Sequence, residues 1–308
     1  MKNFFFLQAI AAVTILSSYP STAFAPTTSS SSRPWGHGTV FLSAVETTSE
    51  TTSSSSNNNH PSRVMECSNN PRQSGLALLL DEGTRQSHSM AENTAFVTGF
   101  FKGISKPESY RKLLSSLYYV YDAMETTLIH TSDERVQLLN DAALRRVDAL
   151  QEDMQYFYGQ NGDWKAKIPK PTPATETYVA RILELGANPE LSYLLIAHQY
   201  TRYLGDLFGG QMMGGMASKS MNLPSDGSGV AFYTFKDIDN TQRYITDWYR
   251  RLNSLDLTDQ QKQNIVDEAN FVFGLNIGIL EELEGSPFAA LWTMAVSTLK
   301  EKLGFSQR

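Results

Sequence analysis

Hydrophobic residues recur at helical spacing from about Gly75 to about Leu303, with polar residues between them. Apolar positions that return every three to four residues are typical of a helix that buries one face. We therefore expect an all-α fold, a single-domain helical bundle with short connections. The predicted helices cover residues 73–95, 107–128, 133–159, 174–186, 189–221, 237–253, 258–284 and 287–303.

Signals for β-strands are scarce. The one β-rich run, residues 230–235, is short and follows the turn-forming residues 224–229, so we expect irregular structure there. Three prolines between residues 169 and 173 should separate the third and fourth helices, because proline removes a backbone donor and clashes with the preceding turn. The last predicted helix ends in several charges and cannot span a bilayer, so we expect no stable membrane anchor.

The N-terminal region has the pattern of a targeting sequence. Lys2 precedes an apolar run of residues 4–16, which is too short to cross a bilayer, and small residues follow around Ala23. A stretch rich in Ser, Thr and Asn then extends to about residue 60. This order resembles the bipartite presequences of algae with secondary plastids.

The resemblance implies three segments: a signal peptide at 1–23, a plastid transit peptide or disordered linker at 24–71, and one functional domain at 72–303. It also implies that the mature protein resides in the plastid, the chloroplast stroma. A plain secretory signal is the alternative.

Charge and cysteine content narrow the function. The chain has 308 residues and a formal net charge of -6, which argues against a nucleic-acid-binding protein, because such proteins carry a basic surface that meets phosphates. Its single cysteine, Cys67, allows neither an internal disulfide nor a thiolate metal cluster. A reducing compartment fits this composition better than secretion.

Glycines crowd into one predicted helix. Gly205, Gly209 and Gly210 lie in the run YTRYLGDLFGGQ, and two more glycines follow at 214 and 215. Each interior glycine costs a helix about 1 kcal/mol relative to alanine. Gly205 and Gly209 are four residues apart and share a face, where bare backbone lets a flat ligand approach closely. Tight packing between helices is the other interpretation.

A charged pair flanks this glycine face. Arg202 and Asp206 are four residues apart, so their side chains can meet. A surface ion pair is the ordinary explanation. Beside a reactive ligand, the carboxylate could instead organise water that delivers protons.

Three histidines lie within the predicted domain and could bind a metal carried by a flat ligand. His198 is seven residues before Gly205 on the same helix, about 10.5 Å along its axis, which is too far for a metal centred over the glycines. His130 stands near a helix end, where a capping or surface role suffices.

His88 lies on a different helix, with Arg85 one turn earlier and Glu92 one turn later. Glu92 could accept the second ring N–H and fix the orientation of the imidazole, as metal-binding histidines require. A satisfied or exposed histidine without a ligand is the other interpretation.

With these residues the chain resembles the haem oxygenases, most nearly those of the algal and cyanobacterial plastid type. The resemblance runs in order from about residue 73 to residue 285. The matching segments are HSMAENTAF at 88–96, LYYVY at 117–121, YTRYLGDLFGGQ at 200–211, LNI at 275–277 and EEL at 281–283.

The resemblance implies that His88 binds the haem iron and that Glu92 accepts its second N–H. The remaining site residues follow by the same carry-over: Tyr121, Arg202, Asp206 and Asn276 around the distal waters, the backbones of Gly205 and Gly209 beside the iron, and Tyr200 and Arg85 toward the edge that carries the propionates.

The implied activity is oxidative opening of haem, which is substrate and cofactor at once. With O2 and supplied electrons the products would be biliverdin, CO and ferrous iron. The biliverdin would serve the supply of phycobilin or phytochrome chromophores. Ferredoxin, an acidic protein, would be the electron donor and would favour a local basic patch. Lys165, Lys167 and Lys170 could contribute to that patch.

The chain departs from the family pattern in three places. Phe208 stands where the family commonly has a small serine, and Asp81 stands where many relatives place a basic residue for a propionate. Arg243, Arg250 and Arg251 do not match the spacing of the family's basic pair on that helix. The propionate contacts are thus left open.

Two other functions compete with the enzyme. A catalytically inactive haem-binding or haem-sensing module would keep the haem ligand but not the chemistry. A non-haem di-iron oxidase would need paired Glu-x-x-His motifs on several helices, and the sequence has none.

Overall fold

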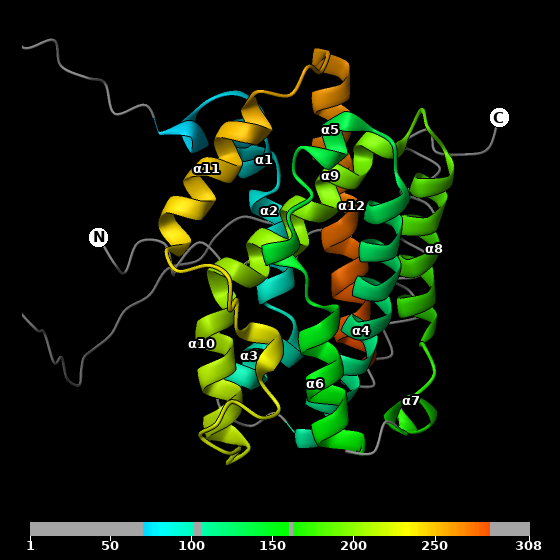
Figure 1. The fold of residues 1–308 in the computed structure, drawn as a ribbon, viewed down its shortest axis with the longest axis vertical. Helices are drawn as coiled ribbons and strands as arrows, with labels where there is room; N and C mark the ends of the chain where they lie inside the picture. The colour runs from blue at the N-terminus through cyan, green and yellow to red at the C-terminus, as the bar shows by residue number, and fades with distance from the viewer. Residues whose placement is uncertain (1–69, 102–105, 160–162, 284–308) are drawn as a thin grey trace, which may run out of the picture. The chain divides into compact units, whose positions relative to one another are not determined.

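The computed structural model describes residues 70–101, 106–159 and 163–283. Every regular element among them is a helix, so the all-α prediction is confirmed for that part of the chain (Figure 1). The elements are η1 (Pro71–Gln73), α1 (Gly75–Gly83), α2 (Arg85–Glu92), α3 (Ala95–Phe101), α4 (Pro107–His130), α5 (Glu134–Gln137), η2 (Ala142–Leu144), α6 (Val147–Tyr158), α7 (Trp164–Lys167), α8 (Pro173–Ala187), η3 (Ser192–Leu194), α9 (Leu195–Gln199), η4 (Tyr200–Leu204), α10 (Gly205–Ser220), η5 (Ala231–Tyr233), α11 (Thr241–Asn253) and α12 (Asp259–Leu283).

Helix α12 is the central element of the bundle (Figure 1). It packs against α1, α2, α3, α4, α8 and α9. Residues 271–279 of α12 are all buried, as expected for a helix with neighbours on every side. Helix α2, which carries His88, and η4, which precedes the glycines, therefore both pack against α12.

Periodicity locates the long helices well. The predicted helix at 107–128 begins with α4 and ends two residues before it. The predicted helices at 174–186 and 258–284 agree with α8 and α12 to within one residue at each end. Proline begins α4 and α8, where its fixed backbone suits the first helical turn. The run at 230–235 contains the short 3₁₀ helix η5, so the expectation of irregular structure there is confirmed.

Two predicted helices are wrong because the chain interrupts them. Residues 73–95 divide into α1 and α2 at Thr84, whose hydroxyl donates to the Leu80 carbonyl at 2.7 Å. Residues 133–159 begin as α5 and resume as α6, and between them Asp141 accepts the Ala143 N–H at 3.0 Å. Short polar side chains compete with the helical backbone in this way, and hydrophobic periodicity does not register them.

Several predictions lie outside the described residues. These are the signal and transit segments, apart from the last two residues of the 24–71 range, and the helix expected at 287–303. Within the described ranges, no helix is long and apolar enough to cross a membrane.

A buried carboxylate holds η5 in place. Asp153 of α6 accepts the N–H groups of Ala231 and Phe232 at 2.8 and 2.9 Å, and burial raises its pKa to about 6. The folded state therefore binds a proton between pH 4 and 6 that the unfolded state has released, so the free energy of unfolding falls as pH rises through that range. Asp153→Asn should remove this dependence, and wild type should lose about 3 kcal/mol relative to the variant between pH 4 and pH 7.

Urea unfolding at the two pH values measures this difference. Glu152→Gln is the matched control, because Glu152 is the adjacent residue but lies exposed in a pair with Lys236. Parallel pH dependence in wild type and Asp153→Asn would show that Asp153 does not titrate in this range.

Candidate functional site

The glycines of α10 divide into two sets with different surroundings. A Cβ built on Gly210 or Gly214 would lie 3.3 or 3.0 Å from Tyr233, so these two glycines serve helix packing. A Cβ built on Gly205, Gly209 or Gly215 would meet no atom within 4 Å. The packing interpretation therefore fails for the pair singled out in the sequence, and their backbone faces open space.

A π-helical turn precedes this bare face. Residues 189–221 were predicted as one helix, but the chain passes from η3 and α9 through the π turn η4 into α10. A π turn inserts an extra residue into the helical path and is often found at functional sites. Here it carries Arg202 one turn before Gly205.

A polar network fills the interior beside Gly205. The Tyr121 hydroxyl donates to Asp206, and Arg202 donates to Asp206 Oδ1 at 3.1 Å and to the Tyr121 oxygen at 3.3 Å. Arg202 also donates to Asn276 Oδ1 at 2.8 Å. The four residues grouped by the sequence thus meet, although they come from α4, η4, α10 and α12.

Burial controls the charge of this network. It raises the pKa of Asp206 well above its ordinary value, because the charged carboxylate loses the stabilisation that water would give it. It also raises the pKa of Glu92 to about 8. Burial therefore disfavours the charged form of both site carboxyls.

His88 and the polar network are supported by neighbouring residues of α12. The His88 ring meets Phe273 edge to face, with ring centroids 5.3 Å apart. Asn276, which accepts from Arg202, lies three residues after Phe273 and so on the same side of α12. One turn of a central helix thus positions the imidazole and the network.

His88 and Glu92 form the expected pair. His88 Nδ1 lies 3.8 Å from Glu92 Oε2, and the His88 side chain is 40 % exposed. Glu92 Oε2 is buried and has no hydrogen-bond partner. At 3.8 Å the two atoms are neighbours but lie beyond hydrogen-bond range.

The other histidines of the described chain have structural roles. His198 is fully buried and its Nε2 lies 3.1 Å from Glu268 Oε1, which also accepts from Arg181 at 2.9 Å. The exposed His130 places Nδ1 2.7 Å from the Thr126 carbonyl in the last turn of α4. The contact of His130 agrees with the capping or surface role inferred for it from the sequence.

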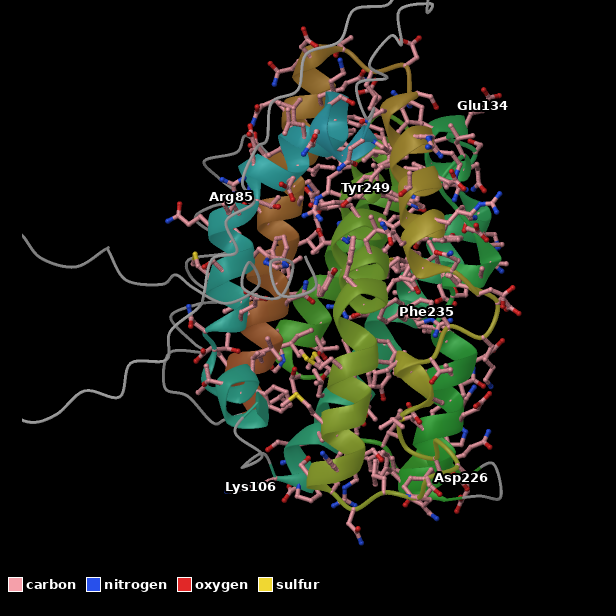
Figure 2. The ribbon with its side chains drawn as sticks, turned by 90° about the vertical axis from the view of Figure 1, so that its left-hand side faces the viewer. Arg85, Lys106, Glu134, Asp226, Phe235 and Tyr249 are labelled. Atoms are coloured by element: carbon pink, nitrogen blue, oxygen red, sulfur yellow. The ribbon has the colours of Figure 1, made fainter. Side chains whose placement is uncertain are left out.

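The residues expected beside the propionates, Arg85 and Tyr200, are less closely grouped than those of the polar network. The Arg85 side chain is 59 % exposed, 4.0 Å from Asp81, and Figure 2 labels it at the edge of the ribbon. Tyr200 is partly buried in η4, and burial raises its pKa to about 12. The arginines of α11 point elsewhere: Arg243 and Arg250 pair with Asp247.

Sequence reasoning missed two tyrosines and one phenylalanine. Tyr178 is fully buried and lies near enough to Arg202 for that charge to oppose the rise that burial causes in its pKa. Tyr233 packs beneath Gly210 and Gly214, and Phe273 contacts His88. No motif marks them, since their positions depend on contacts between distant segments.

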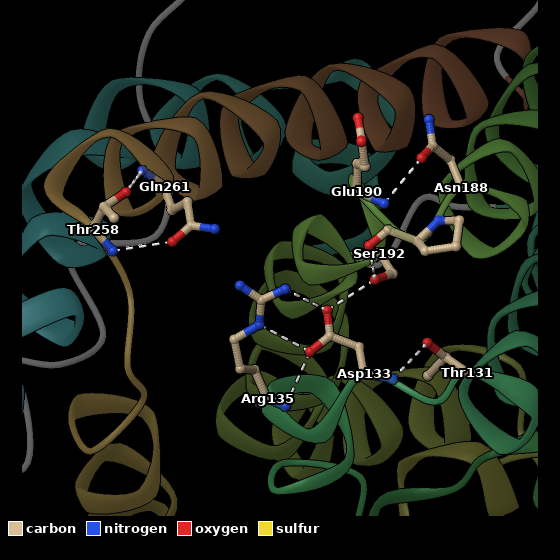
Figure 3. Close-up of polar contacts among 9 residues, drawn as sticks. Thr131, Asp133, Arg135, Asn188, Glu190, Ser192, Thr258 and Gln261 are labelled. Atoms are coloured by element: carbon tan, nitrogen blue, oxygen red, sulfur yellow. Dashed lines mark hydrogen bonds and ion pairs between the residues drawn. The ribbon is translucent and has the colours of Figure 1, made fainter.

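A second polar cluster is less suited to chemistry. Asp133 accepts from Arg135 and from Ser192 at 2.8 Å, as Figure 3 shows. The three residues line a surface hollow. The Asp133 carboxylate is thus engaged in helix capping and an ion pair. Among the described residues, no three His, Cys, Asp or Glu side chains gather closely enough to hold a metal ion, so the di-iron alternative gains no ligand set.

Comparison with known proteins places this geometry in a family. The family model described as heme oxygenase matches residues 74–282. Heme oxygenase 1 of Nostoc sp. is 44% identical over 231 residues, which cover 74% of this chain and 94% of the relative. Heme oxygenase of Porphyra purpurea is 42% identical over 230 residues, with coverage of 74% and 94%.

Solved structures agree. The crystal structure of heme oxygenase-1 from the cyanobacterium Synechocystis sp. in complex with heme is 40% identical, has a TM-score of 0.65, and the match covers 73% of this chain and all of that one. Family model, sequence relatives and fold coincide over the stretch that contains the glycine face, the polar network and His88. The chain belongs to the haem oxygenase family.

Proposed function

We propose that this chain cleaves haem to biliverdin with release of CO and ferrous iron, using O2 and electrons from a reduced partner. One juxtaposition carries the proposal: α12 supports His88 through Phe273 and the Arg202–Asp206 network through Asn276. The structures of two Synechocystis relatives, solved with heme, support haem as the ligand.

The residues present fit a haem. Gly205 and Gly209 offer backbone with open space in front of it, and Glu92 has a buried oxygen without a partner beside His88. We infer that His88 Nε2 binds the iron, with Nδ1 donating to Glu92. The haem supplies the iron that binds O2 and is itself the molecule that is oxidised.

The protein's own residues act on protons and position. Tyr121 and Arg202 hold the Asp206 carboxyl by hydrogen bonds, and burial raises its pKa, which favours its protonated form. Asp206 can then pass a proton through water toward the reacting oxygen. The bare backbone of Gly205 and Gly209 would let a flat ligand lie close against α10 and would restrict the space on that side of it.

The test is a reconstituted turnover with haem, O2 and a reductant, followed by mass analysis of the products. Biliverdin and CO in equal amounts support the proposal. A stable haem complex that never turns over under these conditions would contradict it and favour an inactive haem-binding or haem-sensing module.

We infer ferredoxin as the donor and the plastid stroma as the location. Relatives from plastid-bearing algae, such as Guillardia theta at 41% identity, support the location, and the family match begins only at residue 74. We accordingly propose that residues 1–71 are the presequence and 72–303 the catalytic domain. Lys165 and Lys167 in α7 provide surface cations for an acidic donor, so turnover with ferredoxin should slow as salt rises.

Substitutions at Gly209 should separate the stability of α10 from the binding of haem. Gly209→Ala removes an interior glycine without a clash, so we expect stability to rise by up to about 1 kcal/mol. Gly209→Leu should fill the space proposed for haem and weaken haem binding at least tenfold, by steric exclusion. Thermal melts and absorbance titration with haem measure the two effects.

Gly214→Ala is the matched control. Its new methyl group meets Tyr233 at 3.0 Å, so it should destabilise the helix packing while leaving the haem face open. If Gly209→Leu binds haem as tightly as wild type, the glycine face is not the binding face.

A further inference from the structure

Two of the three departures of this chain from the family pattern, Asp81 and Phe208, meet at one side chain. Arg72, in η1, donates from Nε to Asp81 Oδ1 at 3.1 Å, and a second donor of the same guanidinium also reaches Asp81. The guanidinium lies over the Phe208 ring, 5.7 Å from its centroid. The acidic residue at 81 and the aromatic residue at 208 are therefore partners of the same arginine.

Arg72 stands where the two sides of the site converge. Asp81 belongs to α1, which continues through Thr84 into α2, the helix of His88. Phe208 belongs to α10 and lies three residues after Gly205, so its side chain stands beside Gly205 at the border of the glycine face. A flat ligand with His88 on one side and the glycines on the other would present one edge to Arg72.

Other cations of the described chain are less suited to that edge. Arg202 is committed to Asp206 and Asn276 inside the bundle. Arg243 and Arg250 pair with Asp247 on exposed positions of α11. Arg85 is 59 % exposed and lies 4.0 Å from Asp81, whereas the Arg72 side chain is only 25 % exposed.

We propose that Arg72 binds a carboxylate at the edge of the planar ligand, and that Asp81 and Phe208 hold its guanidinium in position. The inference rests on the proposed function, since haem carries two propionate carboxylates along one edge. A guanidinium is suited to both contacts, because its planar fork binds carboxylates and its face stacks on aromatic rings. Tyr200 and Tyr249 lie close enough for the Arg72 charge to act on them, which places both hydroxyls near the same edge.

The substitution at 81 then has a physical explanation. An acidic residue there cannot bind a carboxylate, but it can hold an arginine supplied by the preceding segment. Phe208 adds a surface on which the guanidinium stacks, which a serine does not offer. The cation is thus retained at the edge while its position in the sequence changes.

The test compares two ligands on ferric protein by absorbance titration: haem and its dimethyl ester, in which both carboxylates are capped. Wild type should bind haem about tenfold more tightly than the ester. Arg72→Gln should lose about tenfold in haem affinity and bind the ester unchanged. The exchange of Arg72→Asp with Asp81→Arg should restore part of the preference, because a cation remains at the edge.

Arg243→Gln is the matched control, an arginine with an exposed side chain and an acidic partner, and it should change neither affinity. Thermal melts establish that each variant is folded, and Arg72→Met, which keeps a long side chain without the charge, replaces Arg72→Gln if the latter is not. Equal weakening of both ligands by Arg72→Gln, or selective loss in Arg85→Gln alone, would overturn the proposal. Failure of wild type to bind either ligand would instead contradict the proposed function.

Discussion

His88→Ala is expected to abolish the absorption spectrum of imidazole-ligated haem and to stop turnover. The imidazole lies against Phe273, and Glu92 is placed to accept its second N–H, so no other histidine of the described chain can take its place. His198 is engaged by Glu268 in the core and His130 lies at the far end of α4. Absorption and resonance Raman spectra of the ferric and ferrous complexes measure the loss.

Two comparisons make the result specific. Added imidazole should restore the spectrum in His88→Ala, because the side chain is 40 % exposed and its removal leaves a space that solvent can reach. His130→Ala, which changes an exposed histidine, should leave the spectrum as in wild type. An unchanged spectrum in His88→Ala would assign the iron to another ligand.

The sequence predicts the site more completely than it predicts the helix boundaries. Arg202 and Asp206 are close in the chain, so helical spacing alone brings them together. Their contacts with Tyr121 and Asn276 could be inferred only through the family resemblance, because these residues are 70 or more positions away. The structure brings all four into one network.

The interruptions of the helices could not be predicted from the sequence, for a physical reason. Thr84 and Asp141 end or cap helical segments through single side-chain hydrogen bonds, which leave no periodic signal. The π turn at η4 is likewise invisible, since its residues are as compatible with an α-helix as with a π-helix. Such features arise when packing overrides local preference.

The glycines show what structure adds to a motif. From the sequence alone, each of four glycines lowers the stability of the same helix by a similar amount: Gly205, Gly209, Gly210 and Gly214. In the fold, two of them receive Tyr233 and two face open space. Only the surroundings separate a packing glycine from one that admits a ligand.

Asp206→Ala is expected to keep haem binding and to lower the rate of ring opening by about a hundredfold or more, the usual contribution of a positioned acid. The carboxyl is the acceptor shared by Tyr121 and Arg202, and burial raises its pKa well above the ordinary value, which suits a proton donor. Without it, reduced O2 should leave unproductively, so more O2 should be consumed for each ring opened. The ratio of O2 uptake to biliverdin formed measures this uncoupling.

Smaller changes in the same network separate proton delivery from packing. Asp206→Asn keeps the hydrogen bond from Arg202 but cannot supply the proton, so its rate should fall nearly as far as that of the alanine variant. Tyr121→Phe removes one donor and leaves the carboxyl, so its loss should be smaller, and its O2 uptake should stay better coupled. Asp247→Asn, on the exposed face of α11, should react as wild type does. Normal coupling in Asp206→Asn would mean that the proton reaches the oxygen by another route and that Asp206 only shapes the network.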